Sequence, residues 1–241
     1  MELHLQTPKD WDALTQSDLI YLSRLQRAGK SENEAALLLY LFHSGMRIAE
    51  RDRDTVLIVY ASREYRIRAD VFVRLSDAML RFVRDFRGFD PKFPEFDPRS
   101  RYFDGVSLRE FFAMENNRAA YLHTGDPEYL HELARLLYPG VSGKKACEEI
   151  DDIAFMWFEG MKAYFAGIYP DYFGKAGTDE DDTAETPDMR EYFHSTVRAL
   201  TGGDITKTRE VLESDVRTAL WELNEKAREI REIKQIKEKC R

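Results

Sequence analysis

Cysteine is scarce in this 241-residue sequence, and the other marks of a secreted or membrane-bound chain are missing too. Its two cysteines, Cys147 and Cys240, lie far apart, which argues against a disulfide framework and suits a reducing compartment. No apolar run reaches the roughly 20 residues of a membrane span, and the opening MELHLQTPKDW lacks a signal-peptide pattern. We therefore expect a cytoplasmic protein that does not associate with membranes.

A surplus of positive charge is also missing, because the formal net charge is -8. General nucleic-acid binders need excess Lys and Arg at the contact surface. The stretch RDFRGFDPKFPEFDPRSRYF, residues 84–103, interleaves basic and aromatic residues as single-strand binders do. Acidic residues within it nearly cancel its charge, so we expect its aromatics to cover a core and no nucleic acid to bind.

The familiar motifs of catalysis and cofactor binding do not occur. The five histidines form no HExxH pattern, there is no GxSxG elbow, and GVSGKKA lacks the spacing of a phosphate-binding loop. The acidic run CEEIDD opens a helix, where the macrodipole favours negative charge and a structural role is expected. The sequence thus predicts no catalytic, metal or cofactor residue, and a protein that is not an enzyme.

Hydrophobic periodicity and capping residues predict an α+β fold that is predominantly helical. Residues 54–68 alternate as a β-hairpin does, and residues 46–48 could add a strand to it. Capping patterns open helices at Ser31, at Ser107 with Glu110, and at Asp126 with Pro127. Other helices are expected near 17–29, over 69–86, over 147–168 and after Pro187, and a long helix ends the chain.

Two segments interrupt this pattern. Prolines rule out a regular helix over residues 86–105, whose many aromatics indicate a loop folded onto the surface as a lid or a binding edge. Residues 174–187 are acidic and hold no large apolar residue, so they cannot offset the entropy of ordering them. We expect a main domain over 1–173, an acidic linker over 174–187 and a helical unit over 188–241.

The terminal helix carries an apolar stripe, but it becomes steadily more polar toward its end. The sequence does not show what covers this stripe. Such a stripe is typical of a helix that docks in a partner's groove. An alternative of equal weight is a helix that packs at its start and frays at its tip. The candidate partner-binding residues are Val216, Leu220, Trp221, Leu223, Ala227, Ile230 and Ile233.

Three stretches resemble the tail-module proteins of phages and prophages from Bacteroidetes-type bacteria. They are TPKDWDALTQSDLIYLSRL, SLREFFAMENNRAAYLHTGDPEYLHELARLLYP and LTGGDITKTREVLESDVRTALWELNEKARE. These stretches lie between residues 7 and 229, and the similarity spans most of the chain. These proteins are similar to tail assembly chaperones, which coat the tape-measure protein until tail-tube subunits displace them. The resemblance implies a tape-measure or tail-tube partner, with self-association possible. It assigns no role to any single residue.

Two other classes of function stay open. A structural virion component, such as an adaptor or terminator, would be found in purified particles, where a chaperone would be absent. An enzyme would need a polar pocket assembled from residues far apart in the sequence.

Overall fold

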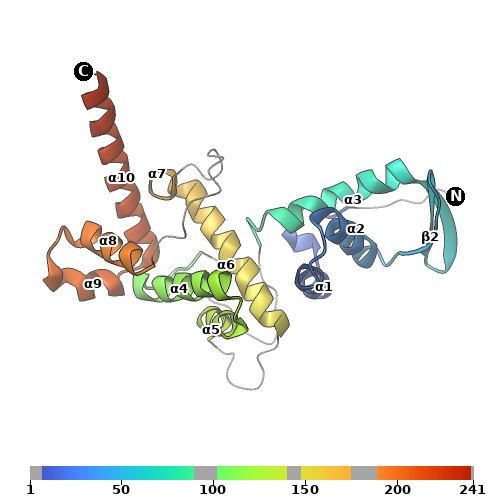
Figure 1. Cartoon of the computed structure of the whole chain (residues 1–241), viewed down its shortest axis with the longest axis horizontal. Helices are drawn as coiled ribbons and strands as arrows, with labels where there is room; N and C mark the ends of the chain where they lie inside the picture. The colour runs from blue at the N-terminus through green and yellow to red at the C-terminus, as the bar shows by residue number, and fades with distance from the viewer. Residues whose placement is uncertain (1–6, 90–101, 140–147, 175–188, 240–241) are drawn as a thin grey trace. The chain divides into compact units, whose positions relative to one another are not determined.

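The computed structural model describes residues 7–89, 102–139, 148–174 and 189–239. It is a predominantly helical α+β structure with a small antiparallel sheet and a long carboxyl-terminal helix, which confirms the predicted fold class (Figure 1). The chain forms two compact units. Unit 1 comprises residues 1–95 and 147–160, and unit 2 comprises residues 96–146 and 161–241.

Unit 1 begins with two helices whose first turns are capped, the second at Ser31 as the sequence predicts and the first at Thr15, a cap that was not predicted from the sequence. Thr15 forms a capping box with Asp18, and the Ser31 side chain accepts a hydrogen bond from the Glu34 N–H. These contacts satisfy N–H groups that a helix start leaves unpaired. The elements of unit 1 are η1 (Trp11–Ala13), α1 (Gln16–Arg27), α2 (Glu32–His43), β1 (Arg47–Arg51), β2 (Thr55–Tyr60), β3 (Arg63–Arg68), α3 (Ala69–Arg84) and the first part of α6 (Glu148–Ile168).

The sheet of unit 1 is a meander in the order β1-β2-β3 with antiparallel pairing throughout. Ala61 and Ser62 both have positive φ, as the tight turn between two hairpin strands requires. Val56 and Ile58 are buried and face the core, whereas the residues of β1 are all exposed. The hairpin predicted over residues 54–68 is confirmed, and β1 is the strand that the 46–48 segment was expected to add.

The core of unit 1 forms where α2 packs on α3. At one end the Trp11 ring lies edge-on between Phe82 and Phe89, with centroids 5.0 and 4.8 Å away. Asp152 of α6 accepts a 2.6 Å hydrogen bond from Ser23 of α1 and forms an ion pair with Arg27. Asp152 therefore holds α6 to α1 within unit 1.

Unit 2 surrounds an aromatic centre. Phe103, Phe111 and Phe165 are fully buried and meet edge to face, with ring centroids 5.9 to 6.4 Å apart. The predicted caps at Ser107 and Asp126 are both present. The elements are α4 (Leu108–Thr124), α5 (Pro127–Leu137), the second part of α6, α7 (Pro170–Phe173), α8 (Met189–Thr201), η3 (Ile205–Lys207), α9 (Thr208–Glu213) and α10 (Val216–Lys239).

Helices from both sides of the predicted linker, residues 174–187, belong to unit 2, because α10 packs against α7, α8 and α4. Apart from Gly174 the linker lies outside the described residues, so its role stays a prediction. In the aromatic segment 86–105, Phe89 and Phe103 are buried, while residues 90–101 lie outside the described part, as do Cys147 and Cys240.

Candidate functional site

The first half of α10 is an internal element of unit 2. Val216, Leu220 and Leu223 are between 0 and 4% exposed. The start of the helix is fixed to the start of α4, since the Leu108 N–H donates to the Ser214 carbonyl and the Val216 N–H donates to the Val106 carbonyl, each at 2.9 Å. These three candidate residues therefore stabilise their own unit, and their side chains do not face solvent.

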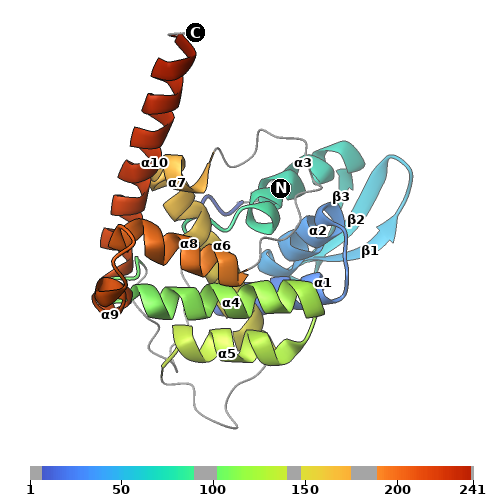
Figure 2. The same ribbon diagram turned by 60° about the vertical axis from the view of Figure 1, so that its left-hand side comes forward.

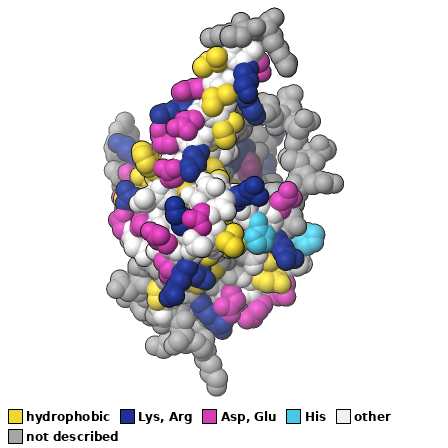
Figure 3. All heavy atoms as spheres, turned by 90° about the vertical axis from the view of Figure 1, so that its left-hand side faces the viewer, with side chains coloured by type: hydrophobic (Ala, Val, Ile, Leu, Met, Phe, Trp, Pro, Cys, Tyr) yellow, Lys and Arg dark blue, Asp and Glu magenta, His cyan; other side chains and the backbone are white. Residues whose placement is uncertain are grey.

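The second half of α10 differs sharply. Ala227 is half-buried, and the next three apolar residues, Ile230, Ile233 and Ile236, are 56, 52 and 61% exposed. In Figures 1 and 2 this half extends beyond α8 and α9, and among the described elements of unit 2 only α7 lies beside its beginning. Figure 3 shows hydrophobic side chains following one another along it, with acidic and basic ones on either side.

These three isoleucines form what we call the isoleucine row, which comes from a three-residue pattern in REIREIKQI, residues 228–236. At 3.6 residues per turn, each isoleucine lies about 60° around the helix from the one before. The residue two positions before each isoleucine is basic, and the residue one position before it is Glu or Gln. The two kinds of side chain therefore lie on different sides of the row. Residues 228–239 hold five basic and three acidic residues, although the chain as a whole is acidic.

Trp221 lies on a different side of α10. It is 55% exposed, but its position is about 180° around the helix from Ile230, the first residue of the isoleucine row. One flat surface cannot contact these two side chains. The seven candidate residues thus separate into a buried set, a half-buried Ala227, an exposed Trp221, and the exposed Ile230 and Ile233.

Polar contacts anchor α10 where the isoleucine row begins. The Asn224 side-chain oxygen accepts hydrogen bonds from the Asp171 N–H at 2.9 Å and the Tyr172 N–H at 3.3 Å. Asn224 therefore caps the first turn of α7, whose own N-cap residue, Tyr169, makes no such bond. Arg231, which follows Ile230, forms an ion pair with Asp171 of α7.

A second candidate site is a pocket of about 470 Å³ within unit 2. Glu115 of α4 is 5% exposed, and its two carboxylate oxygens lie 2.8 and 3.1 Å from the Lys162 Nζ of α6. Arg118 lies one turn further along α4, with its guanidinium 3.9 Å from the same carboxylate. The lining consists of Glu115, Arg118, Ala119, Leu122, His123, Lys162, Tyr172, Phe173, Met189 and Tyr192.

Two tyrosines form one wall of this pocket. The hydroxyl groups of Tyr172 and Tyr192 lie 2.7 Å apart, and the Tyr172 hydroxyl is 3.4 Å from the Thr196 hydroxyl. Burial raises the pKa of Tyr172 and of Tyr192, and the neighbouring Tyr172 raises the pKa of Tyr192 further. Both phenols are therefore protonated at neutral pH and can donate hydrogen bonds.

Sequence reasoning missed this pocket. Glu115 and Lys162 are 47 residues apart, and neither stands in a motif. Glu115 could have been noticed as a carboxylate on the apolar side of a predicted helix, because such residues are rarely buried without a partner. The partner itself depends on how α6 packs against α4, which no local pattern specifies.

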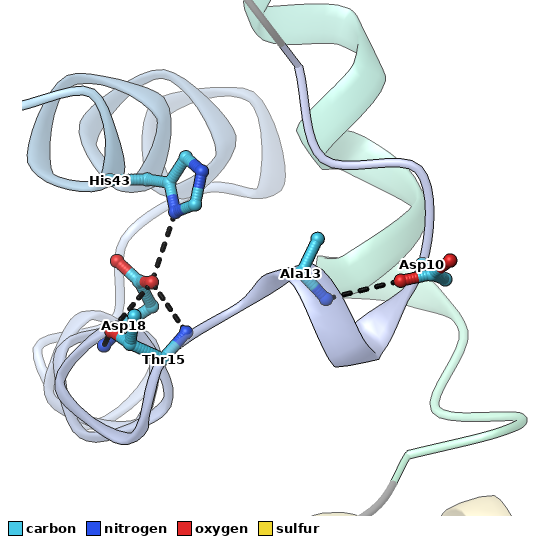
Figure 4. A network of polar contacts seen from close by, with 5 residues as sticks. All are labelled: Asp10, Ala13, Thr15, Asp18 and His43. Carbon is cyan, nitrogen blue, oxygen red and sulfur yellow. Dashed lines mark hydrogen bonds and ion pairs between the residues drawn. The ribbon is translucent and has the colours of Figure 1, made fainter.

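Unit 1 contains a buried polar network around Asp18 that connects two helices (Figure 4). One Asp18 carboxylate oxygen accepts from the Thr15 N–H at 2.7 Å and the Thr15 hydroxyl at 2.8 Å, and it lies 3.0 Å from the His43 Nδ1. Asp18 is 2% exposed. Its contacts hold the start of α1 against the end of α2, so we assign it to stability.

Among the described residues, no three or more His, Cys, Asp or Glu side chains group as metal ligands. Within the same ranges, no helix combines the length and the apolar character needed to cross a membrane. No family description, curated protein or solved structure matches the chain.

Proposed function

We propose that this protein is not an enzyme and that it binds a protein partner through the isoleucine row of α10. The observation that supports the proposal is the contrast along one helix. Its first half is buried and fixed to α4, while its second half presents Ile230, Ile233 and Ile236 at more than half exposure. A fixed helix that ends in an exposed apolar row is pre-organised to dock, so little ordering entropy is lost on binding.

The partner that fits this surface is another amphipathic helix. A ridge of isoleucines at three-residue spacing packs into the groove between the side-chain rows of a facing helix. Since basic residues outnumber acidic ones around the row, a partner helix with acidic residues at its rim is favoured. We propose the tape-measure protein as this partner during phage tail assembly, in line with the sequence resemblance.

The free energy gained by burying the isoleucine row fits many weak contacts better than one tight contact. Covering the exposed parts of three half-exposed isoleucines is worth about 3 kcal/mol, which does not by itself hold a complex. Several copies that bind along one long helical chain and also associate with one another would combine such contacts. A coat of this kind stays reversible, as a protein that must later yield to tail-tube subunits requires.

Co-expression with a phage tape-measure protein tests the proposal. The triple variant Ile230→Ser, Ile233→Ser, Ile236→Ser should lose co-purification, because its row no longer gains from burial. The matched control is Ile205→Ser, which removes an 83% exposed isoleucine elsewhere in unit 2. Equal recovery of the partner with the triple variant and the wild type would contradict the proposal.

An enzymatic function is the second candidate, and the pocket of unit 2 is the observation that favours it. Glu115, Lys162, Tyr172 and Tyr192 converge there from four helices. The carboxylate of Glu115 pairs with the ammonium of Lys162, and the two phenols pair with each other, which suits holding a ligand. No nucleophile is held by a general base among these contacts.

A further inference from the structure

We propose that a second copy of this chain pairs with the free edge of β3 in unit 1, so that two three-stranded sheets join into one antiparallel sheet. This inference goes beyond the proposed function and uses no residue of the isoleucine row. Figure 2 shows β1 and β3 as the two edges of the sheet. The pairing of β1 with β2 shifts between Ile48 and Glu50, whereas β3 pairs with β2 without a break. A bulge protects an edge from further pairing, so β3 is the regular edge.

The backbone of β3 offers unpaired groups along this edge. In a hairpin with a two-residue turn, the first residue after the turn forms a hydrogen-bonded pair across it, and here that residue is Arg63. The direction of the backbone groups alternates along a strand, so those of Glu64, Arg66 and Arg68 point away from β2. Ala69 keeps this alternation, since its N–H donates to a carbonyl on the β2 side. Within the described part of the chain, no hydrogen bond from another element reaches the outer edge.

The side chains of β3 are complementary to those of a second copy. When the two strands pair antiparallel with Tyr65 opposite its own counterpart, Glu64 lies opposite Arg66 of the second copy, and Arg66 opposite its Glu64. Arg63 then lies opposite Ile67 of the second copy. Opposite charges and aromatic rings that face each other across strands stabilise a sheet. This register places no two like charges directly opposite.

The neighbouring registers are disfavoured. Moving one strand by two residues in either direction places Arg66 opposite Arg66 or Glu64 opposite Glu64, and like charges in such positions are destabilising. Moving it by one residue places outward backbone groups opposite inward ones, so the hydrogen bonds are lost. The edge of β3 therefore specifies one register for a second copy.

The pairing needs opposite signs and no surplus of positive charge. Glu64 lies opposite Val59 of β2, is exposed, and forms no ion pair with another described residue. Arg66 lies 3.7 Å from Glu50 and 3.2 Å from the Thr55 hydroxyl, and both charged side chains are more than half exposed. A guanidinium has five N–H donors, so Arg66 can keep these contacts and also bond Glu64 of the second copy.

Analytical ultracentrifugation of the full chain tests the pairing. One strand edge is a small contact, so we expect reversible dimerisation with a Kd of about 1–500 μM. Glu64→Arg brings arginines opposite each other and Arg66→Glu brings glutamates, so each should weaken dimerisation at least about tenfold. The double variant Glu64→Arg, Arg66→Glu exchanges the charges and should restore the Kd to within about threefold. A wild type that stays monomeric up to about 1 mM would overturn the inference.

An equimolar mixture of the two single variants gives a sharper test. One chain then has two arginines where the other has two glutamates, so both pairs become attractive and a heterodimer should form. Arg51→Glu reverses an exposed charge on β1 and is the matched control, which should dimerise as the wild type does. Circular dichroism of each variant checks the fold. A mixture that stays monomeric while the wild type dimerises would place the contact elsewhere and overturn the inference.

A disulfide at the centre of the contact tests the register without changing any charge. Tyr65 would lie opposite its own counterpart at a non-hydrogen-bonded position, where Cα atoms are about 4.5 Å apart, within reach of a disulfide. Tyr65→Cys should therefore crosslink two chains under mild oxidation, whereas Ile67→Cys should not. The native Cys147 and Cys240 are present in both variants, so only the difference between them counts. Equal crosslinking of the two variants would contradict the register.

These tests are separate from that of the proposed function. The triple isoleucine variant should dimerise as the wild type does, because the isoleucine row belongs to unit 2 and β3 to unit 1. Conversely, Glu64→Arg should still co-purify with the partner of α10. Failure of one proposal would therefore leave the other standing.

Discussion

At the scale of single residues, two polar side chains, the buried Asp18 and the half-buried Asn224, accept hydrogen bonds from backbone N–H groups at a helix start. Asp18 does so for α1 from within the capping box, and Asn224 does so for α7 from a helix more than 50 residues away. A buried acceptor of this kind contributes modestly when present, but its removal leaves donors without partners. The cost of removing it should exceed that of removing an exposed polar side chain.

Asp18→Ala tests this reasoning in unit 1. The variant removes an acceptor of three hydrogen bonds in a site that is 2% exposed, so we expect the free energy of unfolding to fall by about 2–4 kcal/mol. Urea denaturation followed by circular dichroism measures it. Asp77→Ala, on the exposed side of α3, is the control and should change stability by less than about 0.5 kcal/mol. Equal effects of the two substitutions would refute the structural role of Asp18.

The tyrosine pair predicts a loss of stability at alkaline pH. Burial raises the pKa of Tyr172 and Tyr192 above the value of an exposed tyrosine, 10.0, so the folded state keeps protons that the unfolded state releases. This contribution to stability is complete below about pH 10 and is lost as the pH rises above it. The variant Tyr172→Phe, Tyr192→Phe should therefore lose less stability than the wild type between about pH 10 and 12. If the stability of the wild type and of the variant fell equally over this pH range, the tyrosine pair would not contribute to the pH dependence.

At the scale of elements, α6 shows how close packing limits a helix. A Cβ added at Gly160 would lie 2.2 Å from the carbonyl oxygen of Phe86, which is backbone and cannot move aside freely. A Cβ added at Gly167 of the same helix would meet nothing within 4 Å. The two glycines therefore differ only in what surrounds them.

This difference makes Gly160→Ala and Gly167→Ala a matched pair. Alanine favours a helix over glycine by about 1 kcal/mol, so Gly167→Ala should raise the free energy of unfolding by up to that amount. Gly160→Ala should lower it by about 1–3 kcal/mol, because the clash outweighs the gain. Chemical denaturation of both variants compares them directly. A stabilising effect at Gly160 would mean that the close approach of Phe86 is wrong.

The two halves of α10 should also respond differently to truncation. Leu220→Ala should cost about 2–5 kcal/mol, since Leu220 is 1% exposed within unit 2. Ile233→Ala should change stability by less than about 0.5 kcal/mol, since its side chain is half exposed. Thermal unfolding measures both. A large effect of Ile233→Ala would show that the isoleucine row is covered by its own chain.

At the scale of the whole molecule, the sequence predicted best what local chemistry decides. The caps at Ser107 and Asp126 and the hairpin over 54–68 follow from spacing within a few residues, and all are present. Packing at the start of α10 and not at its tip was one of two interpretations of its sequence, but the residue at which burial stops could not be predicted. Burial ends where α7 and α4 no longer reach the helix, which depends on tertiary packing. The Glu115 and Lys162 pair was hidden for the same reason.

Site-specific photocrosslinking tests the central claim, that the isoleucine row contacts a protein partner, most directly. A photoreactive phenylalanine analogue would replace Ile233 in one variant and Ile205 in another, each co-expressed with the tape-measure protein. Both positions are exposed in unit 2, but only the first lies in the row. Our account predicts a covalent product with the tape-measure protein from position 233 and none from position 205. A complex that forms without crosslinking at 233, or that crosslinks equally at both positions, would contradict it.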